Sequence, residues 1–245
     1  MPRLSPEKRR ELIAELEERG AVAVEARPLW PDKYADLNAE TACRFIFDEV
    51  RTVEEVALQP LAVPRKDYLE QLAYQWHECR ETSRTLHLCK SRRLIVSWFV
   101  GALELHAMGC APMKGAVTAK HFEGPGGARQ FVWRAKAMYD NLRHSHLDWR
   151  MDPAQTKGGT SDELDSIRFP NGSNLICMNN DPEGFRGSGM GFVRVEEWSG
   201  MPYPGALLGQ AVLVVQGPPD GKNGFVCTVS NAADQEEFLE AIRRS

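Results

Sequence analysis

Two adjacent carboxylates at the end of an apolar stretch are the residues in this sequence best suited to chemistry. Glu196 and Glu197 close the segment Gly191–Trp198, in which Phe192 and Val195 are typical of a buried strand. One acid of such a pair can hold Mg²⁺ through its water shell, and the next can polarise an attacking water. An ordinary strand that runs out into a solvated turn gives the same pattern. The pair therefore indicates phosphate chemistry only if a phosphate-binding turn lies upstream.

A candidate for that turn runs from Lys90 to Ser97, between a predicted strand and a predicted helix. A phosphate-binding loop points backbone N–H groups at the phosphates, adds a lysine and places a Ser or Thr hydroxyl on Mg²⁺. Ser97 opens the helix and fits the hydroxyl role, but Lys90 stands at the far end of the turn. The glycines of the pattern G-x-x-x-x-G-K-[ST] are absent, and Ile95 is among the residues that replace them. On these grounds the segment is either a phosphate loop or a basic turn before a core helix.

Two further polar sites flank the acid pair in the sequence. Arg186 lies in a loop eleven positions before Glu197, and it is either a functional cation or a solvated loop residue. Ser230 and Asn231 follow an apolar strand, and they either serve the site or cap a final helix. The histidines and cysteines show no zinc-site spacing with partners nearby.

The elements that must position these residues alternate between strand and helix from Thr85 onward. The predicted strands cover 85–89, 115–118, 166–169, 173–178, 191–198 and 224–229, and the predicted helices cover 97–108, 128–143, 204–216 and 234–243. Asn171-Gly172 predicts a hairpin between two of these strands, and 151–162 is predicted to be a surface loop. Such alternation predicts an α/β fold with a mainly parallel sheet flanked by helices and with ligands at the carboxyl ends of the strands. We therefore expect the Lys90 turn and the acid pair to meet across neighbouring strands.

The first 80 or so residues show a mainly helical pattern without alternating strands. Helices are predicted at 5–19, 39–56 and 68–81, with a break at Gln59–Pro64. We predict two regions: an N-terminal helical lid over 1–82 and a core over 83–245.

The composition is ordinary for a globular protein, with 42% hydrophobic and 26% charged residues. The net charge of −4 means that any contact with nucleic acid would need a local basic patch. The six cysteines are scattered without a C-x-x-C motif, which favours reduced thiols. We expect no signal peptide at the start of the chain, and no apolar run reaches the roughly 18 residues of a membrane span.

The ordered set of motifs resembles the large terminase subunits, the ATPases that pump DNA into tailed-phage capsids. The stretch Lys90-Ser91-Arg92-Arg93-x-x-x-Ser97 looks like their variant Walker A motif, in which the lysine often comes first. Phe169–Ser173 is similar to a hairpin of that family, and Arg186-Gly187 followed by the acidic strand is similar to another segment. The resemblance covers roughly Tyr74 to Asn231 and implies a P-loop NTPase fold of the ASCE type.

The resemblance also implies a role for each matching residue. Contacts to ATP and Mg²⁺ would come from five residues of the first motif: Lys90, Ser91, Arg92, Arg93 and Ser97. Glu196 would be the Walker B acid, which with Ser97 would hold Mg²⁺, and Glu197 would be the catalytic carboxylate. Arg186 would enter a neighbouring subunit's site. Ser230 and Asn231 would sense the γ-phosphate and pass hydrolysis on to movement.

The family further implies an ATP-driven DNA-packaging motor in the host cytoplasm. It would work as a ring, a pentamer by resemblance, with double-stranded DNA, a portal protein and a small terminase subunit as partners, and without a membrane. Two features depart from the pattern: Ile95 stands where the loop usually has glycine, and the chain ends at Ser245 without the family's nuclease domain. DNA cleavage is therefore not expected of this chain. The alternative is a degenerate P-loop domain with a structural role in DNA or capsid binding and no hydrolysis.

Overall fold

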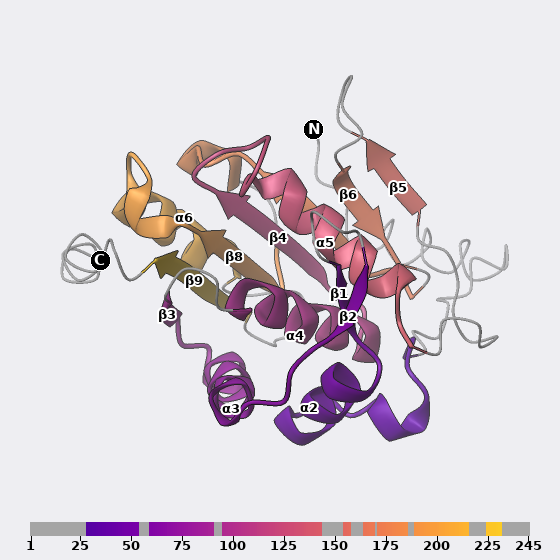
Figure 1. Ribbon diagram of the computed structural model, residues 1–245. Helices are drawn as coiled ribbons and strands as arrows, with labels where there is room; N and C mark the ends of the chain where they lie inside the picture. Colours follow the sequence, from indigo (N-terminus) through magenta and orange to yellow (C-terminus); the bar gives the residue numbers. More distant parts are fainter. Residues whose placement is uncertain are drawn as a thin grey trace, which may run out of the picture.

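A seven-stranded sheet forms the centre of the molecule (Figure 1). The structure is a computed structural model, and it describes residues 28–53, 59–90, 95–143, 154–157, 164–169, 171–185, 189–215 and 224–231. The strands lie side by side in this order: β3 (Leu86–Lys90), β9 (Phe225–Asn231), β8 (Phe192–Glu196), β4 (Lys114–Ala119), β7 (Asn174–Met178), β6 (Leu164–Arg168) and β5 (Ala154–Lys157). The first five are parallel, whereas β6 and β5 run antiparallel to their neighbours. The predicted α/β fold with a mainly parallel sheet is confirmed.

Helices cover both faces of this sheet. One face carries α2 (Ala39–Asp48), α3 (Asp67–Thr82), α4 (Val96–Cys110) and α5 (Ala128–Asp140), and the other carries α6 (Pro204–Val215). Short 3₁₀ turns occur at η1 (Asp32–Tyr34), η2 (Pro182–Phe185) and η3 (Trp198–Gly200). In Figure 1, α4 and α5 lie across the sheet, and α6 lies beside β8 and β9.

The alternation of side chains along β8 divides the core into two clusters. Phe192 points to the face under α4 and α5, whereas Val193 and Val195 point to the face under α6. Arg194 and Glu196 share the face of Phe192 and are buried there. The strand therefore presents two charged side chains toward α4.

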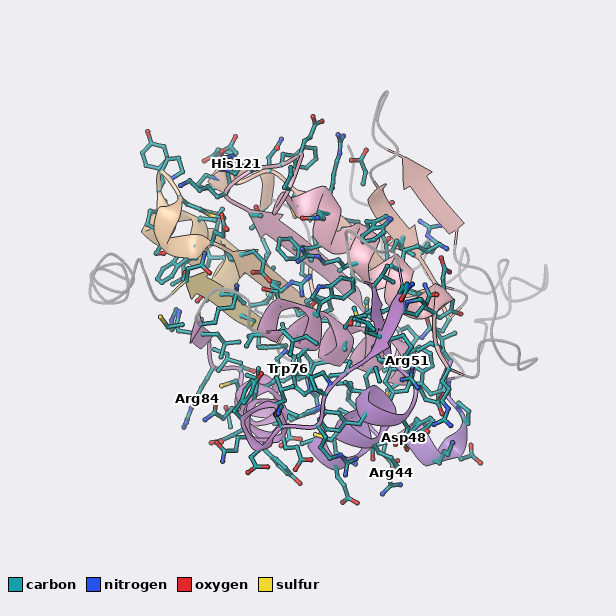
Figure 2. All side chains as sticks on the ribbon, in the orientation of Figure 1. Arg44, Asp48, Arg51, Trp76, Arg84 and His121 are labelled. Atoms are coloured by element: carbon teal, nitrogen blue, oxygen red, sulfur yellow. The ribbon has the colours of Figure 1, made fainter. Side chains whose placement is uncertain are left out.

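The described part of the N-terminal region packs onto the same face. Trp76 extends inward from α3 between that helix and α4 (Figure 2), and its ring meets Phe225 of β9 edge-on at 4.7 Å. The Trp30 indole donates a hydrogen bond to the carbonyl of His106 in α4 at 2.8 Å. These residues belong to one continuous core with α4 and α5. A function of this region as a lid stays a prediction, as does the boundary at residue 82.

Several predicted elements have different bounds in the structure. The Asn171-Gly172 hairpin is confirmed: β6 and β7 pair antiparallel, and Gly172 takes a φ of +87°. The helix predicted over 39–56 is wrong beyond Asp48, because residues 51–53 form strand β1 (Arg51–Val53), which pairs with β2 (Pro60–Ala62). The loop predicted over 151–162 contains β5. The helices predicted at 5–19 and 234–243 lie outside the described residues.

All six cysteines are described, and none forms a disulfide. Within the described ranges, no helix combines the length and apolar character needed to cross a bilayer.

Candidate functional site

Three predicted site residues end three adjacent parallel strands. Lys90 is the last residue of β3, Asn231 the last of β9 and Glu196 the last of β8. Because parallel strands present their carboxyl ends at one edge, these side chains meet there. Strand β9 lies between β3 and β8, so the expectation that the turn and the acids meet across neighbouring strands is corrected: the site spans three strands.

The helix α4 brings Ser97 to the same edge. The Ser97 hydroxyl donates a hydrogen bond to Oε2 of Glu196 at 3.1 Å, across 99 positions of sequence. Both residues are buried, with exposed fractions of 8% and 2%. The start of the helix after the basic turn is thus in direct contact with the first acid.

Glu196 is a buried carboxylate among cations. Burial raises its pKa, since a charged group loses hydration inside the protein. Arg194, then Lys90, the hydrogen bond from Ser97 and Arg134 all act in the opposite direction and favour the charged form. Because these cations favour the charged form of Glu196, the carboxylate is suited to binding a cation in place of one of them.

Lys90 reaches across to the next strand. Its Nζ donates to Oδ1 of Asn231 at 3.4 Å, and the two residues are register partners in β3 and β9. This contact places an ammonium group and an amide on the same face of the sheet as Glu196.

Glu197 has an unusual backbone. Its φ and ψ are 54° and 37°, in the left-handed region that non-glycine residues rarely occupy. Gly126, in the loop between β4 and α5, lies beside it: a Cβ at Gly126 would stand 4.0 Å from Oε1 of Glu197. The turn aims the second carboxylate toward this glycine-containing loop. Strain of this kind is frequent at functional sites.

Ser230 points to the other face of the sheet. Its hydroxyl accepts a hydrogen bond from the backbone N–H of Ser199 at 3.2 Å. On the same side, His87 Nδ1 lies 2.8 Å from the Thr228 hydroxyl, and its ring stacks on Trp198 at 5.2 Å. Ser230 thus fixes the segment after the acid pair to β9, rather than contacting Ser97 or Glu196.

The turn before α4 is described only at its end. Ile95 has a φ of −69° and a ψ of 6°, so this β-branched residue needs no left-handed conformation. Its negative φ shows how the chain can enter the helix without a glycine here. Four predicted site residues lie outside the described residues: Ser91, Arg92, Arg93 and Arg186.

The donor set fits a magnesium ion that also binds phosphate. Mg²⁺ in nucleotide sites usually takes one or two protein oxygens and completes its shell with water and phosphate oxygens. Ser97 and Glu196 supply a hydroxyl and a carboxylate in contact, and no hydrogen-bond donor of the described residues reaches Oε1 of Glu196. Within the described ranges, no group of three or more His, Cys, Asp or Glu side chains forms a metal cage.

Two charged residues at the site were not predicted from the sequence. Arg194 lies two positions before Glu196, and Glu104 lies two turns into α4; each is 1% exposed. The signal was present, because each is an isolated charge in an apolar run, Phe-Val-Arg-Val in β8 and Ala-Leu-Glu-Leu in α4. Such charges are rarely buried unless they are paired.

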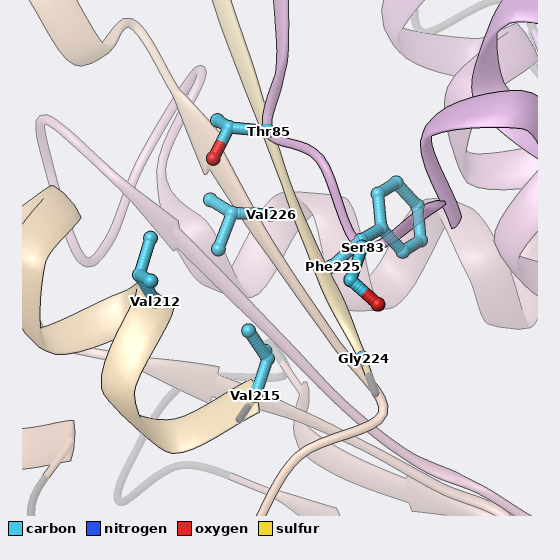
Figure 3. A pocket seen from close by; sticks show the side chains of 7 residues that line it. All are labelled: Ser83, Thr85, Val212, Val215, Gly224, Phe225 and Val226. Atoms are coloured by element: carbon cyan, nitrogen blue, oxygen red, sulfur yellow. The ribbon is translucent and has the colours of Figure 1, made fainter. Parts of the chain in front are cut away.

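A cavity of about 300 Å³ lies elsewhere (Figure 3). Its lining includes Thr85 and Val226, near the amino ends of β3 and β9, together with Val212 and Val215 of α6. The predicted site residues end these strands at the opposite edge. The lining joins the hydroxyls of Ser83 and Thr85 to valine and phenylalanine side chains and holds no charged group. We place the candidate site at the carboxyl edge, where the predicted site residues lie.

The sequence matches no protein-family model and no curated protein. Among solved structures, the crystal structure of the HK97 bacteriophage large terminase is similar, with a TM-score of 0.56 and 11% identity over 78% of this chain. This likeness shows the fold. The chain corresponds to 37% of the HK97 chain, so it spans well under half of that protein.

Two weaker likenesses are also to large terminases. The ATPase domain of the Thermus phage P74-26 large terminase has a TM-score of 0.40 and 16% identity, covering 68% of this chain and 69% of that one. A large terminase of a thermophilic bacteriophage, solved in complex with ADP, has a TM-score of 0.41 and 12% identity, covering 69% of this chain and 38% of that one.

Proposed function

We propose that this chain is the ATPase motor domain of a large terminase, hydrolysing ATP with Mg²⁺ to move double-stranded DNA into a capsid. The observation that carries the proposal is the hydrogen bond between Ser97 and Glu196. It joins the start of the helix after the basic turn to the first acid of the pair. The fold shared with the HK97 large terminase supports the proposal.

In this proposal each described site residue has its own role. Ser97 and Glu196 would hold the magnesium ion, which would neutralise charge on the phosphates when ATP is bound. Lys90 exchanges its contact with Asn231 for a phosphate oxygen, and the freed Asn231 amide senses the γ-phosphate. Glu197 orients the attacking water from its left-handed turn beside Gly126. Ser230 transmits the change by holding the backbone of Ser199.

The residues outside the described ranges complete the proposed site. Ser91, Arg92 and Arg93 contact the triphosphate, and Arg186 acts on a neighbouring subunit's nucleotide, which makes hydrolysis depend on ring assembly. We propose a pentameric ring in the host cytoplasm, with a portal protein and a small terminase subunit as partners. DNA is gripped through its phosphates, so binding weakens steeply with salt.

Phosphate release by the purified protein tests hydrolysis. We expect Mg²⁺-dependent turnover that rises with protein concentration, because assembly supplies Arg186 in trans. Glu197→Gln keeps the size of the side chain but removes its charge, and it should abolish turnover while ADP still binds. Turnover that persists undiminished in Glu197→Gln would exclude the mechanism.

A second candidate is a P-loop domain that binds DNA or capsid proteins without hydrolysis. The missing glycines of the phosphate-loop pattern favour it, because Ile95 is among the residues that stand in their place. Calorimetric titration with a non-hydrolysable ATP analogue and Mg²⁺ separates the two. Absence of binding at millimolar nucleotide would favour the structural role.

A further inference from the structure

A guanidinium lies next to the candidate metal ligands. Arg194 is 1% exposed and occupies the same face of β8 as Glu196. Its Nη1 donates to the backbone carbonyl of Ser97 at 3.2 Å, and its Nε lies 3.8 Å from Oε1 of Glu196. One side chain therefore contacts both residues that would hold the ion.

A second carboxylate holds Arg194 from the other side. Oε2 of Glu104 lies 3.3 Å from Nη1 of Arg194, closer than the approach of Glu196 to Nε. Glu104 stands on α4, seven residues after Ser97, and is 1% exposed. The guanidinium carbon also lies 5.1 Å from the centre of the Phe131 ring. The contacts thus place the cation nearer to Glu104 than to Glu196.

The fold provides room for this arrangement. A Cβ at Gly101 would lie 3.1 Å from Nη1 of Arg194 and 3.3 Å from the Met138 methyl group. A larger residue on this turn of α4 would push the guanidinium away from the helix and toward β8. The glycine therefore permits Arg194 to lie close to α4.

The charges do not balance when both acids are ionised. One guanidinium then faces two carboxylates that are each almost fully buried. Burial raises the pKa of Glu104 to about 7, although Arg194 favours its charged form. Where both acids are ionised, above the pKa of Glu104, the excess negative charge is stabilised by a further cation.

We propose that Glu104 holds Arg194 back from Glu196, so that Glu196 keeps a carboxylate oxygen for a divalent cation. Glu104 is a positioning residue: it fixes where the guanidinium of Arg194 lies between α4 and β8. Without Glu104, Arg194 would approach Glu196 more closely than the present 3.8 Å and compete with the metal. The inference rests on the proposed function, because it assumes that Ser97 and Glu196 hold the ion.

The test measures how much Mn²⁺ strengthens the binding of ADP. The dissociation constant of ADP is determined by calorimetry with Mn²⁺ and with EDTA, and the ratio of the two reports the contribution of the metal. We expect Glu104→Gln to reduce that ratio about tenfold, the scale of changes in groups that orient metal ligands. The double variant Glu104→Gln with Arg194→Met removes the competing cation and should recover most of the loss.

Matched variants separate this effect from general destabilisation. Glu49→Gln makes the same change at another 1% exposed carboxylate, which accepts a hydrogen bond from Tyr34, and it should leave the ratio unchanged. Glu104→Asp retains the charge but shortens the side chain, and it should give a smaller loss in the same direction. This variant provides the test if Glu104→Gln does not fold.

The outcomes distinguish the two proposals. If the dissociation constant of ADP for the wild-type protein is the same with Mn²⁺ and with EDTA, both the metal site and this inference are overturned. A wild-type protein that responds to Mn²⁺, together with unchanged ratios in both Glu104 variants, overturns only the inference. Failure of the double variant to recover the ratio would also overturn it, because Glu104 would then act without Arg194.

Discussion

At the scale of single residues, the Glu196 carboxylate is satisfied on one side only. Oε2 accepts the Ser97 hydroxyl, while Oε1 faces Arg194 at 3.8 Å and, among the described residues, receives no hydrogen bond. An unsatisfied oxygen on a buried acid costs stability in the free protein. Binding of a cation would recover that cost, so stability and the proposed metal binding are opposed at this atom.

Substitutions at Ser97 measure how much its hydrogen bond to Glu196 contributes to the free energy of unfolding. In Ser97→Ala, Glu196 loses its hydroxyl donor, and the free energy of unfolding should fall by about 1–3 kcal/mol. Ser97→Thr keeps a hydroxyl and serves as the matched control in urea denaturation. Equal stabilities of the alanine and threonine variants would mean that the hydrogen bond contributes nothing.

Glu197 offers a second test, because its backbone is left-handed at a φ of 54°. Glycine adopts this conformation without the steric cost of a Cβ, whereas alanine retains that cost. Glu197→Gly should therefore be more stable than Glu197→Ala by about 1 kcal/mol in urea denaturation, and both should lose turnover. Ser83, also at a φ of 54°, provides the same pair of substitutions away from the acid pair. If alanine and glycine gave equal stability at Glu197, the left-handed turn would carry no strain.

At the scale of elements, local sequence patterns predicted the central strands of the sheet better than its outermost strand or the separate β1–β2 pair. The apolar runs of β4, β8 and β9 are buried on both faces, and they were recognised because such runs depend on local composition. Strand β5 has the polar sequence Ala-Gln-Thr-Lys and forms only through pairing with β6. Strand β1 follows a helix without a break in the apolar pattern, and its pairing with β2 is not encoded locally.

The candidate site likewise has features that local sequence predicts and features that depend on distant segments. Ser97, Lys90 and Asn231 could be anticipated because each lies at the start or the end of an element with a recognisable boundary. The insertion of β9 between β3 and β8 could not, since strand order depends on packing between distant segments. The contact of Glu104 with Arg194 likewise joins residues 90 positions apart.

The contact between β4 and β8 provides a prediction at this scale. A Cβ at Gly115 would stand 2.1 Å from Cζ of Phe192, whose ring is 2% exposed. Gly115→Ala should reduce the free energy of unfolding by about 1–3 kcal/mol, since the ring or the strand must shift. Gly209→Ala in α6 is the matched control, because a Cβ there meets no atom of the described residues within 4 Å. That change should stabilise the helix by up to about 1 kcal/mol. A Gly115→Ala protein as stable as the wild type would contradict this packing.

At the scale of the whole molecule, one core joins the N-terminal elements to the sheet, and it contains two buried histidines. His77 on α3 is 4% exposed and His106 on α4 is 0% exposed. Burial lowers the pKa of His77 to about 3, with Arg80 and His106 acting in the same direction. Burial also lowers the pKa of His106 to about 4, although its hydrogen-bonding contact with the Tyr34 carbonyl opposes the shift.

These shifts predict an acid-sensitive core. In the unfolded chain both histidines take up protons below their ordinary pKa of 6.5, whereas the folded protein keeps them neutral until about pH 4 and below. The unfolded state then binds more protons, so stability is present above pH 6.5 and is lost as the pH falls. Between pH 7.5 and 5 the loss should be roughly 2 kcal/mol for each histidine.

His77→Phe isolates one of these contributions. Neither ring nitrogen of His77 has a hydrogen-bond partner among the described residues, so the apolar ring removes the titration without breaking a hydrogen bond. Urea denaturation at several pH values should show that the fall in stability between pH 7.5 and 5 shrinks by about half. The same substitution at exposed His121, labelled in Figure 2, measures the effect of exchanging the ring itself. A fall of the same size in His77→Phe and the wild type would mean that His77 becomes charged in the folded core.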